Sequence, residues 1–108
     1  MFSSNQVVLI GRLTEDAGFY LTRSGRPKLT FRMAVPRPGG WKGPKADYVT
    51  VVCLGRRFQP LLDQLVKGVP VTVIGRLQSR DIPDGRTAVE VRAEAVLVNV
   101  ELATRGEG

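Results

Sequence analysis

Histidine is absent from this 108-residue sequence, and cysteine occurs once, as Cys53. The lack of histidine excludes a histidine-based catalytic triad, an imidazole proton relay and any histidine metal ligand. A single cysteine cannot form an internal disulfide or supply the thiolates of a structural zinc site. Cys53 stands within the apolar run 51–54, which predicts a buried, unreactive thiol in a reducing compartment.

Paired catalytic acids and glycine-rich loops are also missing. Glu15 and Asp16 are adjacent, and the other carboxylates lack the spacing of a general acid–base pair. Gly11 and Gly75 are isolated, so no phosphate-binding glycine loop precedes a helix. These absences predict a protein that is not an enzyme and that needs neither a metal nor a cofactor.

No apolar run is long enough to span a bilayer, and no secretory signal pattern is present. A cytoplasmic location is therefore expected. A chain of this length forms one domain that buries roughly two-thirds of its unfolded surface. We expect the domain to span residues 1–103, followed by a frayed polar tail at 104–108.

Acidic residues are too few to balance the basic ones. Sixteen lysines and arginines against ten aspartates and glutamates leave a net charge of +6, and twelve of these cations are arginine. This excess favours a polyanionic partner, because arginine pairs with phosphate through two hydrogen bonds and also stacks on bases. The alternative is a basic domain whose charge only keeps it soluble.

The chain contains one strand-like sequence written twice. Val-Val-Leu-Ile-Gly-Arg-Leu at 7–13 returns as Val-Thr-Val-Ile-Gly-Arg-Leu at 71–77. Glycine weakens an ordinary strand, so Gly11 and Gly75 predict a bulge, a sharp bend or a close backbone approach. Two strands bent at matching points are typical of a small closed sheet. The alternative is chance similarity between two apolar strands.

Alternating apolar residues and turn signals predict a mainly β chain. The expected strands are 5–14, 19–22, 28–35, 47–54, 69–80 and 87–100. In 47–54 the residues expected in the core are Val49, Val51 and Cys53, and those on the opposite face are Tyr48, Thr50, Val52 and Leu54. In the last strand the expected inward residues are Val89, Val91 and Ala93, and the outward ones are Glu90, Arg92 and Glu94.

One short helix is expected after the strand that ends at residue 54. Its apolar residues fall at helical spacing, with Pro60 early and Gly68 just past the end: Phe58, Leu61, Leu62 and Leu65. With 19–22 as a minor segment, the order is three strands, a helix and two strands. This is the order of the all-β OB-fold, a five-stranded Greek-key barrel with a helix between strands 3 and 4. A meander sandwich is the alternative, and the single helix argues against it.

The sequence resembles the family of bacterial single-stranded DNA-binding proteins. The matching stretches are 5–14, 22–25, 31–35, 51–55, 65–68 and 71–77. Each stretch alone is a weak signal, whereas the ordered set across residues 5–98 is a strong one. The resemblance implies an OB-fold, binding of single strands without base-sequence preference, no catalysis, and assembly of several barrels.

The resemblance also implies four base-stacking positions, usually aromatic. Here they are filled by Trp41, Tyr48, Leu54 and Ile82, so two of the four are aliphatic. Full-length members carry a tail that ends in an acidic, partner-recruiting peptide, and this chain ends at 103–108 without one. We therefore expect weaker strand binding than usual. Replication or repair proteins remain candidate partners, without a tail to recruit them.

Single-strand binding needs cations that follow the phosphates and flat groups on which bases stack. Trp41 precedes Lys42 in the loop 36–46, which is rich in proline, glycine and cations and contains no acid. This predicts an exposed stacking ring beside a phosphate-binding lysine. The alternative for Trp41 is a ring folded back onto the barrel, and for Tyr48 it is cross-strand packing.

Arginines on the predicted strands form a second set of candidates. Arg12 and Arg76 occupy equivalent places in the two repeated strands, and Arg32 and Arg80 lie on neighbouring ones. Side chains that reach one groove would follow the phosphate backbone of a strand. The alternative for each is a solvated surface group.

The first strand is apolar on both faces, with Val8 and Ile10 opposite Val7 and Leu9. One barrel core can bury only one of these faces, so Val8 and Ile10 predict a homo-oligomer interface. The family resemblance implies a dimer or a dimer of dimers, and we expect a tetramer in preference to a dimer.

Three functions stay open from the sequence. The first is coating and protection of single-stranded DNA in replication, recombination or repair. The second is a primosomal accessory module that binds proteins, and the third is single-stranded RNA binding.

Overall fold

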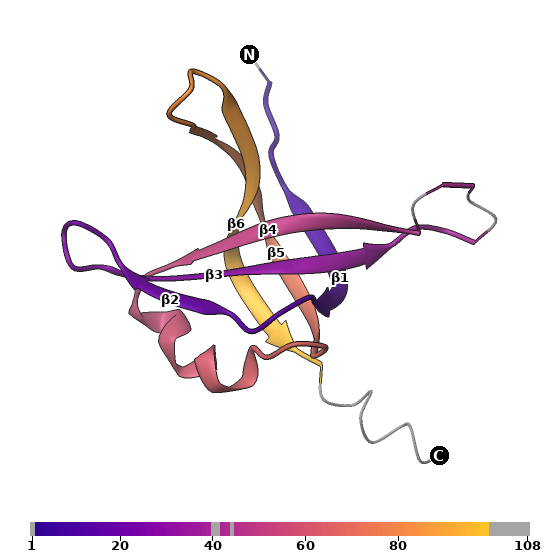
Figure 1. Ribbon diagram of the computed structural model, residues 1–108, viewed down its shortest axis with the longest axis horizontal. Helices are drawn as coiled ribbons and strands as arrows, with labels where there is room; N and C mark the ends of the chain where they lie inside the picture. Colours follow the sequence, from indigo (N-terminus) through magenta and orange to yellow (C-terminus); the bar gives the residue numbers. More distant parts are fainter. Residues whose placement is uncertain (1, 40–41, 44, 100–108) are drawn as a thin grey trace.

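The computed structural model describes residues 2–39, 42–43 and 45–99 (Figure 1). The strands are β1 (Val7–Leu13), β2 (Gly18–Leu21), β3 (Pro27–Pro36), β4 (Ala46–Leu54), β5 (Pro70–Asp81) and β6 (Thr87–Val98). A short 3₁₀ helix, η1 (Arg56–Gln64), separates β4 from β5. Each strand lies within two residues of its predicted bounds. The predicted domain end at residue 103 and the tail lie outside the described residues.

Five of the strands close into a ring. The hydrogen-bonded order is β1-β5-β6-β4-β3, β3 pairs back to β1, and β2 adds to the edge of β3. All pairs are antiparallel except β4 with β6. Figure 1 shows the β3–β4 ribbon crossing the β5–β6 ribbon, whose hairpin continues beyond the crossing. This is the five-stranded barrel of the OB-fold, as predicted. No helix among the described residues has the length and apolar character needed to cross a membrane.

Two glycines allow the ring to close. At Gly11 an added Cβ would lie 2.1 Å from the carbonyl oxygen of Ala34, and at Gly75 it would lie 2.2 Å from that of Arg92. Arg12, which follows Gly11, stands opposite Pro70 on β5 and also opposite Ala34 on β3. The pairing of β5 with β6 shifts register between residues 74 and 75. The predicted close backbone approach is therefore present in both repeated strands.

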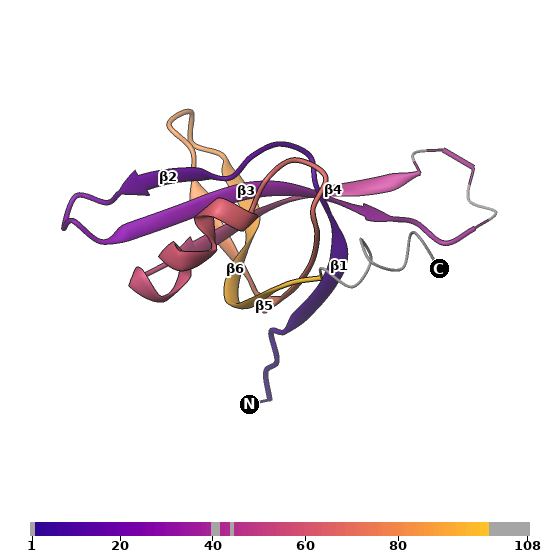
Figure 2. The ribbon, with the colours of Figure 1, turned by 90° about the horizontal axis from the view of Figure 1, so that it is seen from below.

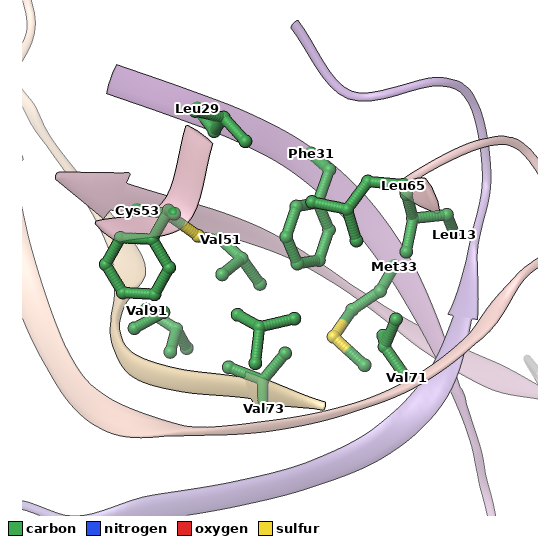
Figure 3. Close-up of a cluster of buried hydrophobic side chains, with 13 residues drawn as sticks. Leu13, Leu29, Phe31, Met33, Val51, Cys53, Leu65, Val71, Val73 and Val91 are labelled. Carbon is green, nitrogen blue, oxygen red and sulfur yellow. The ribbon is translucent and has the colours of Figure 1, made fainter. Parts of the chain in front are cut away.

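Aliphatic side chains fill most of the barrel interior. Those labelled in Figure 3 also include one phenylalanine, one methionine and one cysteine. The labelled side chains point into a common interior: Leu13, Leu29, Phe31, Met33, Val51, Cys53, Leu65, Val71, Val73 and Val91. Cys53 is fully buried, as predicted. Burial raises the pKa of its thiol to about 12, although the nearby Arg57 charge acts in the opposite direction. The thiol is therefore protonated at neutral pH.

The helix η1 runs alongside β3 in the view from below (Figure 2). Phe58 from the helix and Leu65 after it are buried in the core. The Leu65 carbonyl accepts a hydrogen bond from the Ala17 N–H at 2.9 Å, and the Gly68 N–H donates to the Leu13 carbonyl at 2.8 Å. The helix is thereby fixed to the connection between β1 and β2.

Three side chains differ from the predicted pattern. Val89 is 66% exposed, because the β5–β6 hairpin extends beyond the barrel and its inner face there covers no core. Glu90 is buried, with Oε2 3.5 Å from Nε of Arg80 and Oε1 3.3 Å from Nε2 of Gln78. Val52 is buried on the outer face, because β3 and β6 flank it on both sides.

Replacement of Gly11 by alanine tests the closure. The new methyl group would meet a backbone carbonyl, so we expect the free energy of unfolding to fall by about 1–3 kcal/mol, the usual cost of overpacking. Urea titration followed by circular dichroism measures this change. Gly39→Ala is the control, because a Cβ there meets nothing within 4 Å. Equal losses in the two variants would contradict the close approach.

Candidate nucleic-acid interface

The outer face of β3 and β4 holds a polar groove of about 270 Å³. Antiparallel register places Arg32 on β3 opposite Thr50 on β4, and Thr30 opposite Val52. The groove is lined by Glu15, Asp16, Gly18, Tyr20, Thr30, Phe31, Arg32 and Thr50. We call it the β3–β4 groove. Strand alternation directs these polar side chains outward, away from the core side chains on the same strands.

Two exposed tyrosines accompany Arg32 on this face: Tyr20 lines the groove with it, and Tyr48 contacts it. The Arg32 guanidinium carbon lies 5.4 Å from the ring centroid of Tyr48, which is 57% exposed. Tyr20, which is 56% exposed, lies on β2, and its ring covers Gly18 so closely that a Cβ there would lie 2.8 Å from the Tyr20 hydroxyl. The face therefore presents a cation together with two exposed aromatic rings.

The sequence interpretation did not select Tyr20. The signal available in the sequence was its place in a four-residue strand beside a half-buried one. In the structure, Tyr20 is opposite Lys28 in the register. Aromatic positions implied by the family resemblance lie elsewhere, so the residue received no role.

The loop between β3 and β4 leaves one end of the ribbon formed by these strands (Figure 1). Its base is fixed by an ion pair, in which Nη2 of Arg37 lies 2.7 Å from Oδ1 of Asp47. The Arg37 N–H also donates to the carbonyl of Lys45 at 2.8 Å. Lys42 is exposed, as a phosphate contact requires. The predicted stacking residue Trp41 lies outside the described residues.

The two arginines of the repeated strands do not lie in one groove. β1 and β5 are antiparallel, with Val7 opposite Gly75 and Arg12 opposite Pro70, so Arg12 and Arg76 lie at opposite ends of the pair. Nη1 of Arg12 donates to the carbonyl of Gly68 at 2.9 Å. Equivalence in the repeat therefore did not predict proximity.

The remaining predicted residues lie on β4, β5 and the β5–β6 hairpin. Arg80 is half exposed and faces the buried carboxylate of Glu90. Ile82 is half-buried in the hairpin turn, where its N–H donates to the carbonyl of Arg86 at 2.8 Å. Leu54 and Arg76 line a second hollow, of about 270 Å³. The sequence had not predicted that these two residues lie together.

This second hollow is rich in arginine, and we call it the arginine pocket. Its lining residues are Arg26, Leu54, Arg57, Arg76, Arg92, Ala93 and Glu94. Arg76 on β5 is directly opposite Arg92 on β6. Nη1 of Arg57 donates to the Glu94 carbonyl at 2.7 Å, and its guanidinium carbon lies 4.3 Å from the ring centroid of Phe58.

A third surface is apolar. Val8 and Ile10 project outward from β1 and are 59% and 61% exposed. In the register Ile10 is opposite Thr72, which is opposite the exposed Leu97, while Val8 is opposite Ile74. Apolar side chains thus continue across three strands, and we call this surface the β1–β5–β6 face.

Known proteins resemble this chain along most of its length. Residues 4–103 match the model of the single-strand binding protein family. Over 98 residues the chain is 38% identical to a single-stranded DNA-binding protein of Oceanobacillus iheyensis. The aligned region covers 85% of this chain and 61% of that relative. The chain is 36% identical to single-stranded DNA-binding protein 2 of Clostridium acetobutylicum, with coverage of 85% and 74%. The chain thus spans about two-thirds of the length of these curated relatives.

Proposed function

We propose that this chain, which belongs to the single-strand binding protein family, binds single-stranded DNA without base-sequence preference. It would coat and protect strands that are exposed in replication, recombination or repair. The observation that carries the proposal is Arg32 on the outer face of an OB barrel, in contact with the exposed ring of Tyr48 and lining one groove with the exposed Tyr20. Cations and stacking rings side by side are what an unpaired strand requires.

The chemistry of the β3–β4 groove explains the lack of base preference. Every base has a π-face, so a tyrosine ring can stack on any of them, at about 1–3 kcal/mol per base. The Arg32 guanidinium can pair with a backbone phosphate, which is the same for all four nucleotides. Trp41 and Lys42 would extend this path along the loop after β3. Such a site needs no catalytic group, and we infer a binding protein that acts in the cytoplasm.

We also infer a homo-oligomer that buries the β1–β5–β6 face, in a tetramer in preference to a dimer. An apolar surface across three strands is costly to leave in water, and a two-fold axis lets the same patch serve both subunits. Val8 and Ile10 are its contribution from β1, since the core already buries the opposite face of that strand. This face includes neither Tyr20 nor Tyr48, so assembly leaves the β3–β4 groove open to a strand.

Trp41, the only tryptophan in the sequence, reports strand binding. We expect oligo-dT to quench its fluorescence, oligo-rU to bind detectably, and duplex DNA to bind least. Trp41→Ala should cost about 1–3 kcal/mol of binding free energy while the melting temperature stays unchanged. A variant that loses thermal stability and keeps its affinity would show that the ring is packed on the barrel.

Salt dependence tests the phosphate contacts. The logarithm of the affinity for oligo-dT should fall linearly with the logarithm of salt concentration, with a slope of about −0.7 per phosphate neutralised. Arg32→Gln should flatten the slope by about one contact. Arg23→Gln, an exposed arginine outside the groove, is the charge-matched control. An affinity that does not change with salt concentration would favour a protein-binding module.

The proposed interface is tested by Ile10→Arg, which places a charge on the β1–β5–β6 face. We expect light scattering at micromolar concentration to give the mass of several chains for the unmodified protein, and about 11.8 kDa for the variant. Circular dichroism should show that the barrel remains folded. Val66→Arg, at an exposed apolar residue outside this face, should leave the oligomer intact. An unmodified protein with the mass of one chain would contradict the oligomer.

A further inference from the structure

The arginine pocket gathers four guanidinium groups from four separate parts of the chain. Arg26 precedes β3, Arg57 belongs to η1, and Arg76 and Arg92 face each other on β5 and β6. One carboxylate, that of Glu94, lines the same hollow, so the lining residues carry four positive charges against one negative charge. Such a concentration of like charge is unfavourable unless an anion or solvent screens it.

None of the four arginines makes an ion pair with another residue of the described parts of the chain. The ion pairs found there are Arg37–Asp47, Arg80–Glu90 and Arg86–Asp84. Glu94 lines the pocket without coming within ion-pair distance of an arginine, and its backbone carbonyl, not its carboxylate, accepts the hydrogen bond of Arg57. The positive charge of the pocket is therefore left uncompensated by the fold.

One of the guanidiniums is held in place by its surroundings, and a second lies close to a glycine. Arg57 is fixed by its 2.7 Å hydrogen bond to the Glu94 carbonyl and by the Phe58 ring. Arg26 lies over Gly55, whose missing Cβ would be 3.7 Å from Nη2 of Arg26. Groups that are already ordered lose less conformational entropy when they bind a ligand. Arg57 is thus oriented before any anion arrives.

The size and donor chemistry of the pocket match a phosphate group. Guanidinium forks bind phosphate oxygens through paired, charge-assisted hydrogen bonds. The volume of about 270 Å³ lies just below the range of about 300–1,000 Å³ that holds drug-sized ligands. The hollow therefore has room for a phosphate group with part of its sugar.

The pocket lies next to the β3–β4 groove on the same outer surface. Leu54 of the pocket and Thr50 of the groove lie on one face of β4, with Val52 between them. Val52 is opposite Thr30 of the groove on one side and opposite Arg92 of the pocket on the other. A strand that leaves the groove across β4 reaches the arginine pocket after a single row of residues.

We propose that the arginine pocket binds a backbone phosphate of the strand that occupies the β3–β4 groove, so that the strand crosses β4 at Val52. This inference rests on the proposed function and adds a path and a second anchoring point to it. A phosphate is also carried by free nucleotides, and the experiment separates these two sources.

The test uses the double variant Arg76→Gln with Arg92→Gln. The matched control is Arg23→Gln with Arg86→Gln, which removes two exposed arginines outside both hollows and changes the net charge equally. Affinity is measured for oligo-dT of about 4 to 16 nucleotides, the range that one OB-fold occupies. Thermal unfolding checks that all variants are folded, and Arg26→Gln is a second pocket variant.

We expect the double variant to lose about tenfold in affinity for the longer oligonucleotides and little for the shortest, which fill the groove alone. The salt slope for the longer ones should flatten by about 0.7 for each phosphate released. The control should lose much less at every length. Equal losses in the double variant and the control would overturn the proposal, because net charge alone would then explain them.

Thymidine 5′-monophosphate serves as the free-nucleotide probe. We expect it to bind the unmodified protein weakly and to compete poorly with long oligo-dT. A double variant that loses the monophosphate and retains its affinity for long oligo-dT would overturn the assignment to a strand. An unmodified protein that does not bind oligo-dT at any length would contradict the proposed function itself, and with it the path across β4.

Discussion

The architecture depends on two places where one backbone passes another with no side chain between them. At Gly11 and Gly75 the neighbouring carbonyl oxygen occupies the space that a Cβ would need. The first contact lets β1 leave β5 and continue along β3, and the second coincides with the register shift between β5 and β6. Without these contacts the sheet would stay open, and its edges would expose unpaired backbone groups.

Closure of the sheet also divides the surface into parts with different chemistry. Every strand of the ring gives its inner face to one small core, so each outer face is free to vary. β3 and β4 use theirs for polar and aromatic groups, β5 and β6 bring arginines beside β4, and β1 continues an apolar surface across β5. A strand of nucleic acid and a second subunit can then occupy the same small barrel, because their surfaces do not overlap.

The sequence predicted the strands, the helix position and the close approach at the glycines, because alternation and glycine placement are local signals. It did not predict the exposure of Val89, since alternation does not tell where a hairpin passes the end of the core. It also grouped Arg12 and Arg76 as candidates for one groove, although antiparallel pairing separates equivalent positions in a repeat. The arginine pocket could not be predicted from the sequence, because its residues become neighbours only when the ring has closed.

The pairing of β1 with β5 has a consequence for how the protein is made. Val7 is opposite Gly75, so the first strand waits for a partner that lies 68 residues later in the chain. At a synthesis rate of about 5–20 residues per second, this wait lasts roughly 3–14 seconds. During that time the edge of β1 that later pairs with β5 is unpaired on the nascent chain, and apolar strands with an open edge are prone to aggregate. The topology that yields a small closed barrel thus makes β1 the strand that stays exposed to aggregation longest during synthesis.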